Sequence, residues 1–249
     1  MKKRIGLLIA AGISITAIGV GAFSFFGTKN SPANGLSIKV EQLNEQTKNT
    51  IIDFYKDITI SQDLYKMKEG TIDTNKLDIK LPTEFGDSEA DTPSNLLFIS
   101  KTTAEKMAKK GLVRERDNKE GVVSSVPLDS LPKMGKGETI LFANKEYKDL
   151  REITFEGKKM NVQYKGDVWL SPSRGGSNSI LLIVDDILYK EINTKENTRL
   201  FLSFNKSFGN LNLVTSGKDP ELQKEIGNMQ KTLNADEINA VSFVNISEK

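Results

Sequence analysis

Apolar residues are distributed in two ways along this chain: one long run without charges near the N-terminus, then many short runs separated by charged segments. The long run, residues 5–26 (IGLLIAAGISITAIGVGAFSFF), has 22 residues. A helix of this length spans about 33 Å, enough to cross a hydrocarbon core of ~30 Å. Lys2, Lys3 and Arg4 precede it, so the positive-inside rule leaves residues 1–4 in the cytoplasm. The pattern predicts a single-pass transmembrane anchor at residues 5–26, with the cytoplasmic membrane as its partner and the bulk of the chain extracytoplasmic.

A cleaved signal peptide is the alternative for this segment. Residues 20–22 (VGA) offer a cleavage site of the small-x-small type. Cleavage there would leave Phe23, Phe25 and Phe26 at the new N-terminus, whereas in an anchor these rings lie at the membrane interface. The aromatic residues therefore favour the uncleaved anchor, and both interpretations place the remaining residues outside the cytoplasm.

After a polar linker at residues 27–35, residues 36–249 are expected to form one extracytoplasmic domain. A unit recurs in it: a short apolar run, a polar capping residue and a helical segment. The apolar runs are LLFI (96–99), ILFA (140–143) and ILLIV (180–184), and the helical segments are KTTAEKMAKK (101–110), KEYKDL (145–150) and DILYKEI (186–192). The residues between the copies differ, so this is an internal similarity and not a solenoid repeat.

Other segments complete the predicted fold. Further strands are expected at 36–40, 153–155, 160–164, 201–204 and 241–246, and further helices at 41–56 and 220–232. The step Glu156-Gly157-Lys158 between two alternating segments indicates a hairpin turn. The predicted class is α+β: a mixed β-sheet with strand–helix units and a hairpin, covered mainly on one face.

Composition removes several kinds of chemistry. The chain has no histidine and no cysteine, which excludes Ser-His-Asp and Cys-His catalysis, zinc held by His or thiolate, disulfides and a lipid-modified N-terminal cysteine. The net charge is +2, and without Lys2, Lys3 and Arg4 it becomes −1. No basic excess remains to bind nucleic acid.

Several short motifs are candidates for chemistry, and each has a simpler interpretation. Asp87, Glu89 and Asp91 alternate as in a calcium loop, but Thr92 and Phe98 occupy the positions that need Gly and Glu. An exposed acidic loop within residues 82–95 is therefore expected. Asp73-x-Asn75 fails the same template at Leu77.

Two Ser-x-x-Lys pairs, Ser130 with Lys133 and Ser203 with Lys206, resemble a nucleophile motif. The first contains Pro132 and the second lies in a strand-like run, so neither is expected to begin a helix. Chance occurrence explains both pairs better than catalysis does.

Three further features could contact a ligand. The loop at 171–178, with Arg174 beside Gly175 and Gly176, could hold an anion but matches no phosphate-binding fingerprint. Asp185 and Asp186 are expected to cap the helix that begins at Ile187. Trp169 could stack on a glycan or peptide, although a partly buried packing role is more usual.

The runs LLFISKTTAEKMAKKGLV, GETILFANKEYKDL, ITFEGKKMNVQYKG and ILLIVDDILYKEI resemble the extracytoplasmic domain of FtsX-like ABC permeases. The chain is also similar to uncharacterised Gram-positive lipoprotein-like proteins with a short apolar N-terminus. The resemblance covers about residues 36–204 and brings no catalytic motif. A permease has several membrane helices and a lipoprotein has a lipobox cysteine, so neither transport nor lipid attachment is carried over to this chain.

The sequence therefore predicts a non-catalytic, membrane-anchored extracytoplasmic binding or accessory protein of the cell envelope, with a membrane permease complex as its expected partner. No catalytic, cofactor-binding or metal-ligating residue is assigned, and no cofactor or nucleic acid is expected. The alternative is a cell-envelope hydrolase that uses paired carboxylates, because Asp and Glu remain available to it.

Overall fold

The structure is a computed structural model in which residues 31–77, 93–116, 125–172, 178–216, 219–234 and 237–248 are described. The predicted anchor at residues 5–26 lies outside these residues. Within them, no helix has the length and apolar character needed to cross a membrane.

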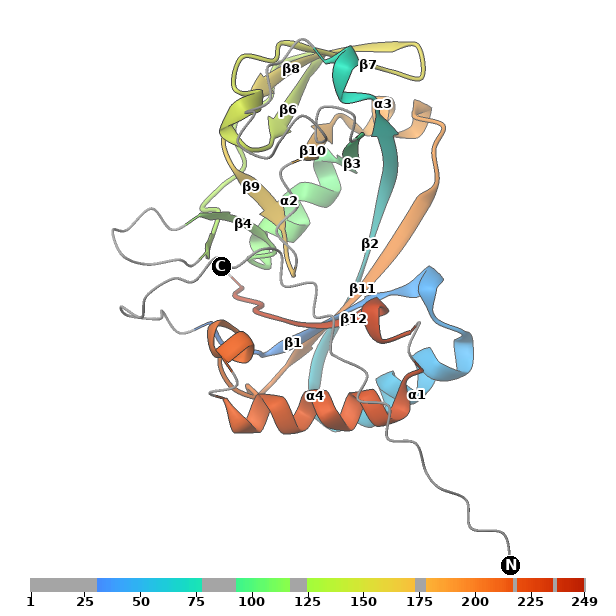
Figure 1. The fold of residues 1–249 in the computed structure, drawn as a ribbon, viewed down its shortest axis with the longest axis vertical. Helices are drawn as coiled ribbons and strands as arrows, with labels where there is room; N and C mark the ends of the chain where they lie inside the picture. Colours follow the sequence, from blue (N-terminus) through green and yellow to red (C-terminus); the bar gives the residue numbers. More distant parts are fainter. Residues whose placement is uncertain are drawn as a thin grey trace, which may run out of the picture.

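Two sheets organise the described residues (Figure 1). The large sheet has nine strands in the order β12-β1-β11-β2-β3-β10-β6-β8-β7, and the small sheet has three in the order β5-β4-β9. The strands are β1 (Gly35–Lys39), β2 (Thr59–Ile72), β3 (Ser94–Ser100), β4 (Val113–Arg116), β5 (Ser125–Pro127), β6 (Glu138–Phe142), β7 (Glu152–Phe155), β8 (Lys158–Tyr164), β9 (Val168–Leu170), β10 (Ser179–Val184), β11 (Glu196–Phe204) and β12 (Val241–Val244). The pairs β3–β10 and β6–β8 are parallel and the other paired strands are antiparallel, so the large sheet is mixed, as the sequence predicts.

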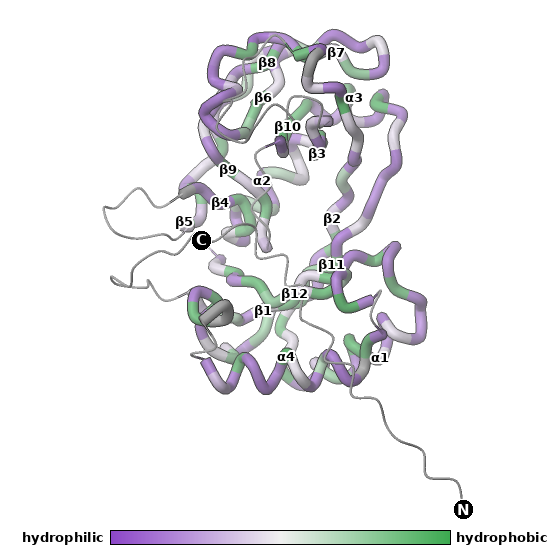
Figure 2. The backbone as a smooth tube through the Cα atoms, viewed as in Figure 1, coloured by the Kyte–Doolittle hydropathy of each residue, from purple (hydrophilic) through white to green (hydrophobic). Residues whose placement is uncertain are grey.

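Four α-helices pack on the large sheet: α1 (Glu45–Tyr55), α2 (Lys101–Lys109), α3 (Asp186–Glu191) and α4 (Pro220–Thr232). Short 3-10 helices lie at Val40–Gln42, Lys56–Ile58, Thr74–Lys76, Lys145–Tyr147, Leu211–Ser216 and Ile238–Ala240. Polar residues cap the α-helices as their sequences indicate, because Asn44, Ser100, Asp185 and Asp219 each accept a hydrogen bond from the first turn. In Figure 2, hydrophilic and hydrophobic residues alternate along α4, the pattern of a helix with one face against the protein.

The sheet has two halves, each with a core of its own. A third core joins them, because Phe201 of β11 and Val244 of β12 pack in the same cluster as Leu181 of β10. We call β12, β1, β11, α1 and α4 the terminal half, and β3, β10, β6, β8, β7, α2 and α3 the central half. The long strands β2 and β11 pair with each other over most of their length and run from one half into the other (Figure 1).

Both faces of the central half are covered, which corrects the expectation of a sheet covered mainly on one face. Leu181 and Ile183 of β10 pack in a core with α2 and the small sheet. Leu182 and Val184, on the opposite face of the same strand, pack in a second core with α3. The central strands are therefore almost continuously apolar, as expected of strands buried on both faces.

The strand–helix units at 96 and 180 become β3–α2 and β10–α3, which lie side by side as a parallel pair. The middle copy differs: β6 is antiparallel to β10, and the helix expected at 145–150 is only a 3-10 turn at Lys145–Tyr147. The hairpin is confirmed, because Phe155 pairs with Lys158 around Glu156 and Gly157. Both of these residues have positive φ (50° and 75°), as a type I′ turn requires.

Candidate ligand-binding site

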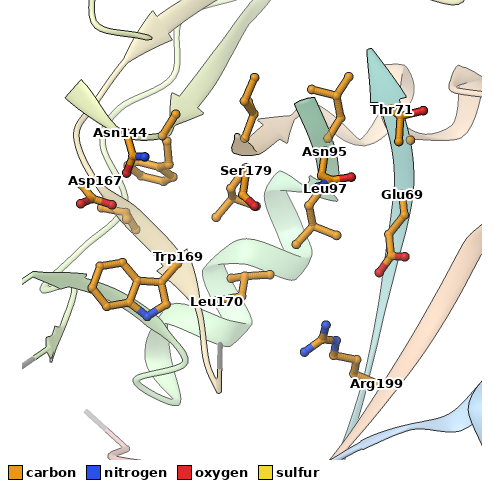
Figure 3. Close-up of a pocket in the computed structure, with 17 residues that line it drawn as sticks. Glu69, Thr71, Asn95, Leu97, Asn144, Asp167, Trp169, Leu170, Ser179 and Arg199 are labelled. Atoms are coloured by element: carbon orange, nitrogen blue, oxygen red, sulfur yellow. The ribbon is translucent and has the colours of Figure 1, made fainter. Parts of the chain in front are cut away.

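A cavity of about 460 Å³ opens between the large sheet and strand β9 of the small sheet (Figure 3). It lies on the α2 face of the central half. Its volume is in the range of small-molecule sites. Figure 3 shows Trp169 on one side of this space and Arg199 with Glu69 on the other.

A row of three small polar residues forms the upper part of the cavity. Thr71 of β2 is paired with Asn95 of β3, and Asn95 is paired with Ser179 of β10. Paired residues of neighbouring strands lie on the same face of a sheet. Within the described part of the chain, none of these three side chains makes a hydrogen bond, so their donors and acceptors are available to a ligand.

An apolar row lies directly below the polar one. Moving two residues along each strand replaces the polar residues by Leu97 of β3 and Leu181 of β10, with Phe142 of β6 next to Leu181. Leu181 and Phe142 are buried, and Leu97 is partly buried. The floor of the cavity therefore suits the apolar part of a ligand.

Strand β9 supplies the opposite wall with Val168, Trp169 and Leu170. Val168 and Leu170 are buried in the core shared with α2, whereas Trp169 is only partly buried. Asn144 and Asp167 adjoin this wall (Figure 3).

Arg199 of β11 is the cationic group of the cavity. Burial lowers its pKa, while the nearby Glu69 carboxylate acts in the opposite direction. An arginine keeps its charge in proteins despite such a shift. Among the described residues, no group accepts a hydrogen bond from the Arg199 guanidinium, so a partly buried cation with five donors faces the cavity.

Lys39 adds positive charge to the side of the cavity that contains Arg199. It is paired with Arg199 across β1 and β11. Burial and the repulsion from Arg199 lower the pKa of Lys39, and Glu69 partly opposes them. One carboxylate thus lies near two cations, which leaves this end able to accept an anionic group.

The structure separates the motifs found in the sequence. Trp169 is the candidate that it brings into the cavity. Asp185 caps α3 as predicted, through Ile187 N–H and Leu188 N–H. Asp186 instead bonds Thr102 at the start of α2, accepting from its hydroxyl at 2.6 Å, and this bond is the main cause of the lowered pKa of Asp186.

The two Ser-x-x-Lys pairs do not begin helices. Ser130 and Lys133 are exposed in an irregular segment, whereas Ser203 is buried in β11 and Lys206 lies over the ring of Phe208. The acidic residues at 87–91 and the anion-loop residues 174–176 lie outside the described residues. Within the described residues, no group of three or more acidic side chains is placed to hold a metal ion.

Sequence reasoning missed Arg199, Glu69, Thr71, Asn95 and Ser179. The signal for Arg199 was a charged residue within the otherwise strand-like TRLFLSF. An arginine in a largely buried strand is uncommon unless its charge is paired. The other four become neighbours only through the register of β2, β3 and β10.

The fold defines an α+β protein built on one large mixed sheet, with a small second sheet beside a cavity. The chain belongs to a family described as uncharacterised lipoproteins, whose profile matches residues 36–246. A crystal structure described as that of a "putative lipoprotein from Bacillus anthracis" is similar to this chain with a TM-score of 0.53. The two are 22% identical, over 86% of this chain and 99% of that one, which supports a shared fold. No curated protein matches the chain.

Proposed function

We propose that this protein is a membrane-anchored extracytoplasmic binding protein that holds a small organic ligand between β9 and the large sheet. The observation that carries the proposal is the preformed cavity, in which the side chains of Arg199, Asn95, Thr71 and Ser179 have no hydrogen-bond partner among the described residues. Ser179 and Arg199 are partly buried, and leaving such groups unpaired there is unfavourable unless a ligand or water satisfies them. Apolar walls with a few convergent polar groups are the usual form of a ligand site.

Trp169 is the single tryptophan of the chain and lines the cavity, so its fluorescence reports occupancy directly. The test titrates the full-length protein, in detergent or nanodiscs, with a panel of amino acids, short peptides, sugar acids and fatty acids. We expect at least one class to change the Trp169 emission and to raise the melting temperature. A panel that changes neither would contradict the proposal.

A matched pair of variants controls this test. Asn95→Tyr places a large side chain in the cavity and is expected to abolish the response. Asn161→Tyr makes the same change at an exposed position of β8 outside the cavity and is expected to leave it unchanged.

Ligand turnover distinguishes binding from the paired-carboxylate hydrolase that the sequence left open. Glu69 and Asp167 are the carboxylates of the cavity, and Figure 3 places them on opposite sides of it. A binding protein releases its ligand chemically unchanged, which mass spectrometry of the eluted ligand checks. A cleaved product that disappears in Glu69→Gln or Asp167→Asn would favour the hydrolase.

Membrane attachment through residues 5–26 is part of the proposal, because the chain has no cysteine to carry a lipid. Mass spectrometry of the membrane-bound protein is expected to find Met1, or Lys2 after methionine removal. A chain released into the medium and beginning at Phe23 would show a signal peptide instead.

Association with a permease complex remains a proposal, tested by co-purification in mild detergent.

A further inference from the structure

From the geometry of β9 we propose that the ligand is a short extended peptide, which adds a strand to the small sheet and places its terminal carboxylate on Arg199. This inference rests on the proposed function, since it names the ligand class of the same cavity. Three independent features of the cavity lead to it.

The first feature is the open edge of β9. In the register of β4 and β9, Arg114 is paired with Trp169, and Ser171 N–H donates to the carbonyl oxygen of Leu112 at 2.8 Å. Hydrogen-bonded and non-bonded pairs alternate in an antiparallel ladder. Val168 and Leu170 therefore direct their N–H and C=O groups away from β4.

These outward groups have no partner among the described residues, where β9 is the edge of its sheet. Both residues line the cavity. An unpaired edge of this kind is a template for another strand, and many peptide-binding domains use such an edge. Here the edge belongs to the wall of a cavity that is partly open to solvent, so an extended peptide can reach it.

The second feature is the pair of surfaces on either side of the edge. Successive side chains of a strand point in opposite directions. The floor at Leu97 and Leu181 can receive one set of side chains. The row of Thr71, Asn95 and Ser179 supplies donors and acceptors for those polar groups of the bound peptide that do not pair with β9.

The third feature is the charge. Arg199 is the cation that lines the cavity, and the guanidinium fork binds a carboxylate through two parallel hydrogen bonds. A peptide with a free C-terminus carries such a carboxylate, and its amide N–H and C=O groups match the edge of β9. A sugar acid or fatty acid would satisfy Arg199 but not the edge.

The experiment compares four probe pools on the full-length protein, read by Trp169 fluorescence. They are random tetrapeptides with a free C-terminus, the same pool as C-terminal amides, the same pool with N-methylated backbone amides, and a mixture of free amino acids. N-methylation removes the N–H donors that a β-ladder needs while leaving the carboxylate. We expect the free pool to bind about tenfold to a hundredfold more tightly than the amide or N-methylated pool.

Two variants identify the carboxylate receptor. Arg199→Gln is expected to bind the free and amide pools equally, and Arg199→Lys to recover part of the preference because it restores the charge without the fork. Hydrogen exchange is a second measurement, independent of fluorescence. Bound peptide should slow exchange at the Val168 and Leu170 amides and leave the exposed Asn161 amide unchanged.

The outcomes separate this inference from the proposed function. Equal binding of the free and N-methylated pools, or a response to sugar acids or fatty acids with none to peptides, would overturn the peptide inference and leave a small-ligand site in place. If no probe changes the Trp169 fluorescence, while circular dichroism shows that the protein and both Arg199 variants are folded, the peptide inference and the proposed function are both overturned. Dimerisation without peptide, with slowed exchange at Leu170, would show that a second copy pairs with β9 and would also overturn the inference.

Discussion

The terminal and central halves of the large sheet are stabilised in different ways. The core of the terminal half contains a cluster of rings formed by Tyr55, Phe204, Phe208 and Phe243. These residues come from opposite ends of the domain. The central half is built mostly of aliphatic residues from the strand–helix units within residues 94–192.

This difference shows how the site is assembled. The central half supplies a regular floor, whereas Arg199 and Glu69 come from β11 and β2, the strands shared with the terminal half. A ligand in the cavity would therefore touch both halves. Substitutions in each half test whether the two halves behave as one unit.

Truncating a core residue in each half gives the largest expected effect. Phe204 stacks on Tyr55 with ring centroids 5.1 Å apart, and Leu182 is fully buried in the central half. We expect Phe204→Ala and Leu182→Ala to lower the free energy of unfolding by about 3–5 and 2–5 kcal/mol respectively. Urea unfolding of a chain beginning at Ser31, which we expect to be soluble and monomeric, should show one transition by both circular dichroism and Trp169 fluorescence. Two separate transitions would show that the halves unfold independently.

Two glycines test the contact between α2 and the end of the chain. Gly111 has a φ of +68°, and an added Cβ would lie 2.8 Å from the Ser247 carbonyl oxygen. Gly137 has a φ of +73° with nothing within 4 Å of that position. Gly137→Ala should therefore cost about 1–2 kcal/mol for the left-handed backbone alone, and Gly111→Ala about 3 kcal/mol because of the added clash. Equal melting temperatures for the two variants would mean that the contact with Ser247 does not constrain α2.

Helix capping should differ between the halves by a smaller amount. Asp185 of the central half accepts two hydrogen bonds, both from α3, whereas Asp219 accepts one from Leu222 N–H of α4 and one from Asn210 N–H at 2.6 Å. Replacing either by Ala should cost about 0.5–2 kcal/mol, with the larger loss at Asp219 because two segments lose a contact. Chemical unfolding of both variants measures this difference, and a larger loss at Asp185 would contradict it.

The same cap predicts a pH dependence. Hydrogen bonds from Asn210 N–H and Leu222 N–H hold the pKa of Asp219 below its ordinary value of 3.8. A carboxylate with a lowered pKa in the folded state contributes its stability above pH 3.8, and this contribution disappears as the pH falls through the lower, folded-state value. Stability curves of the wild type and Asp219→Asn should therefore converge below pH 3.8. Parallel curves at all pH values would exclude this group as a source of acid sensitivity.

The smallest effect is expected on β2 between the halves. Leu64 is 66% exposed and contributes little to either core. Leu64→Thr should change the free energy of unfolding by less than about 0.5 kcal/mol. A larger loss would show that this surface is covered in the native protein, which comparison of the full-length chain with a chain beginning at Ser31 would check.

Much of the fold could be predicted because its signals are local. Ser100 and Asp185 follow apolar runs and cap the next helix, so strand, cap and helix are adjacent in the sequence. Strand β2 gave no such signal, since its pattern mixes exposed Leu64 with buried Lys68. The Lys68 ammonium donates to the carbonyl oxygens of Tyr189 at 2.8 Å and Ile192 at 2.5 Å, a contact that no local pattern contains.

The site was less predictable than the fold for a related reason. Trp169 could be singled out because it is the one tryptophan, but its role depends on the edge of β9, a three-residue strand too short to recognise. Thr71, Asn95 and Ser179 are ordinary polar residues in the sequence and form a row only through strand register. A site made by register is invisible until the pairing of the strands is known.

The pairing of β1 has a consequence for the time course of folding. Its neighbours are β11 and β12, so residues 35–39 cannot pair until residues 196–204 and 241–244 have been synthesised. Asn34 likewise cannot form its two hydrogen bonds with Ile246 until that residue has been synthesised. The strands and helices between residues 94 and 192 have their partners much sooner, and contacts that are close in sequence form faster. The first strand to emerge is therefore among the last to be paired, and until then its exposed edge is open to chaperones, proteases and other chains.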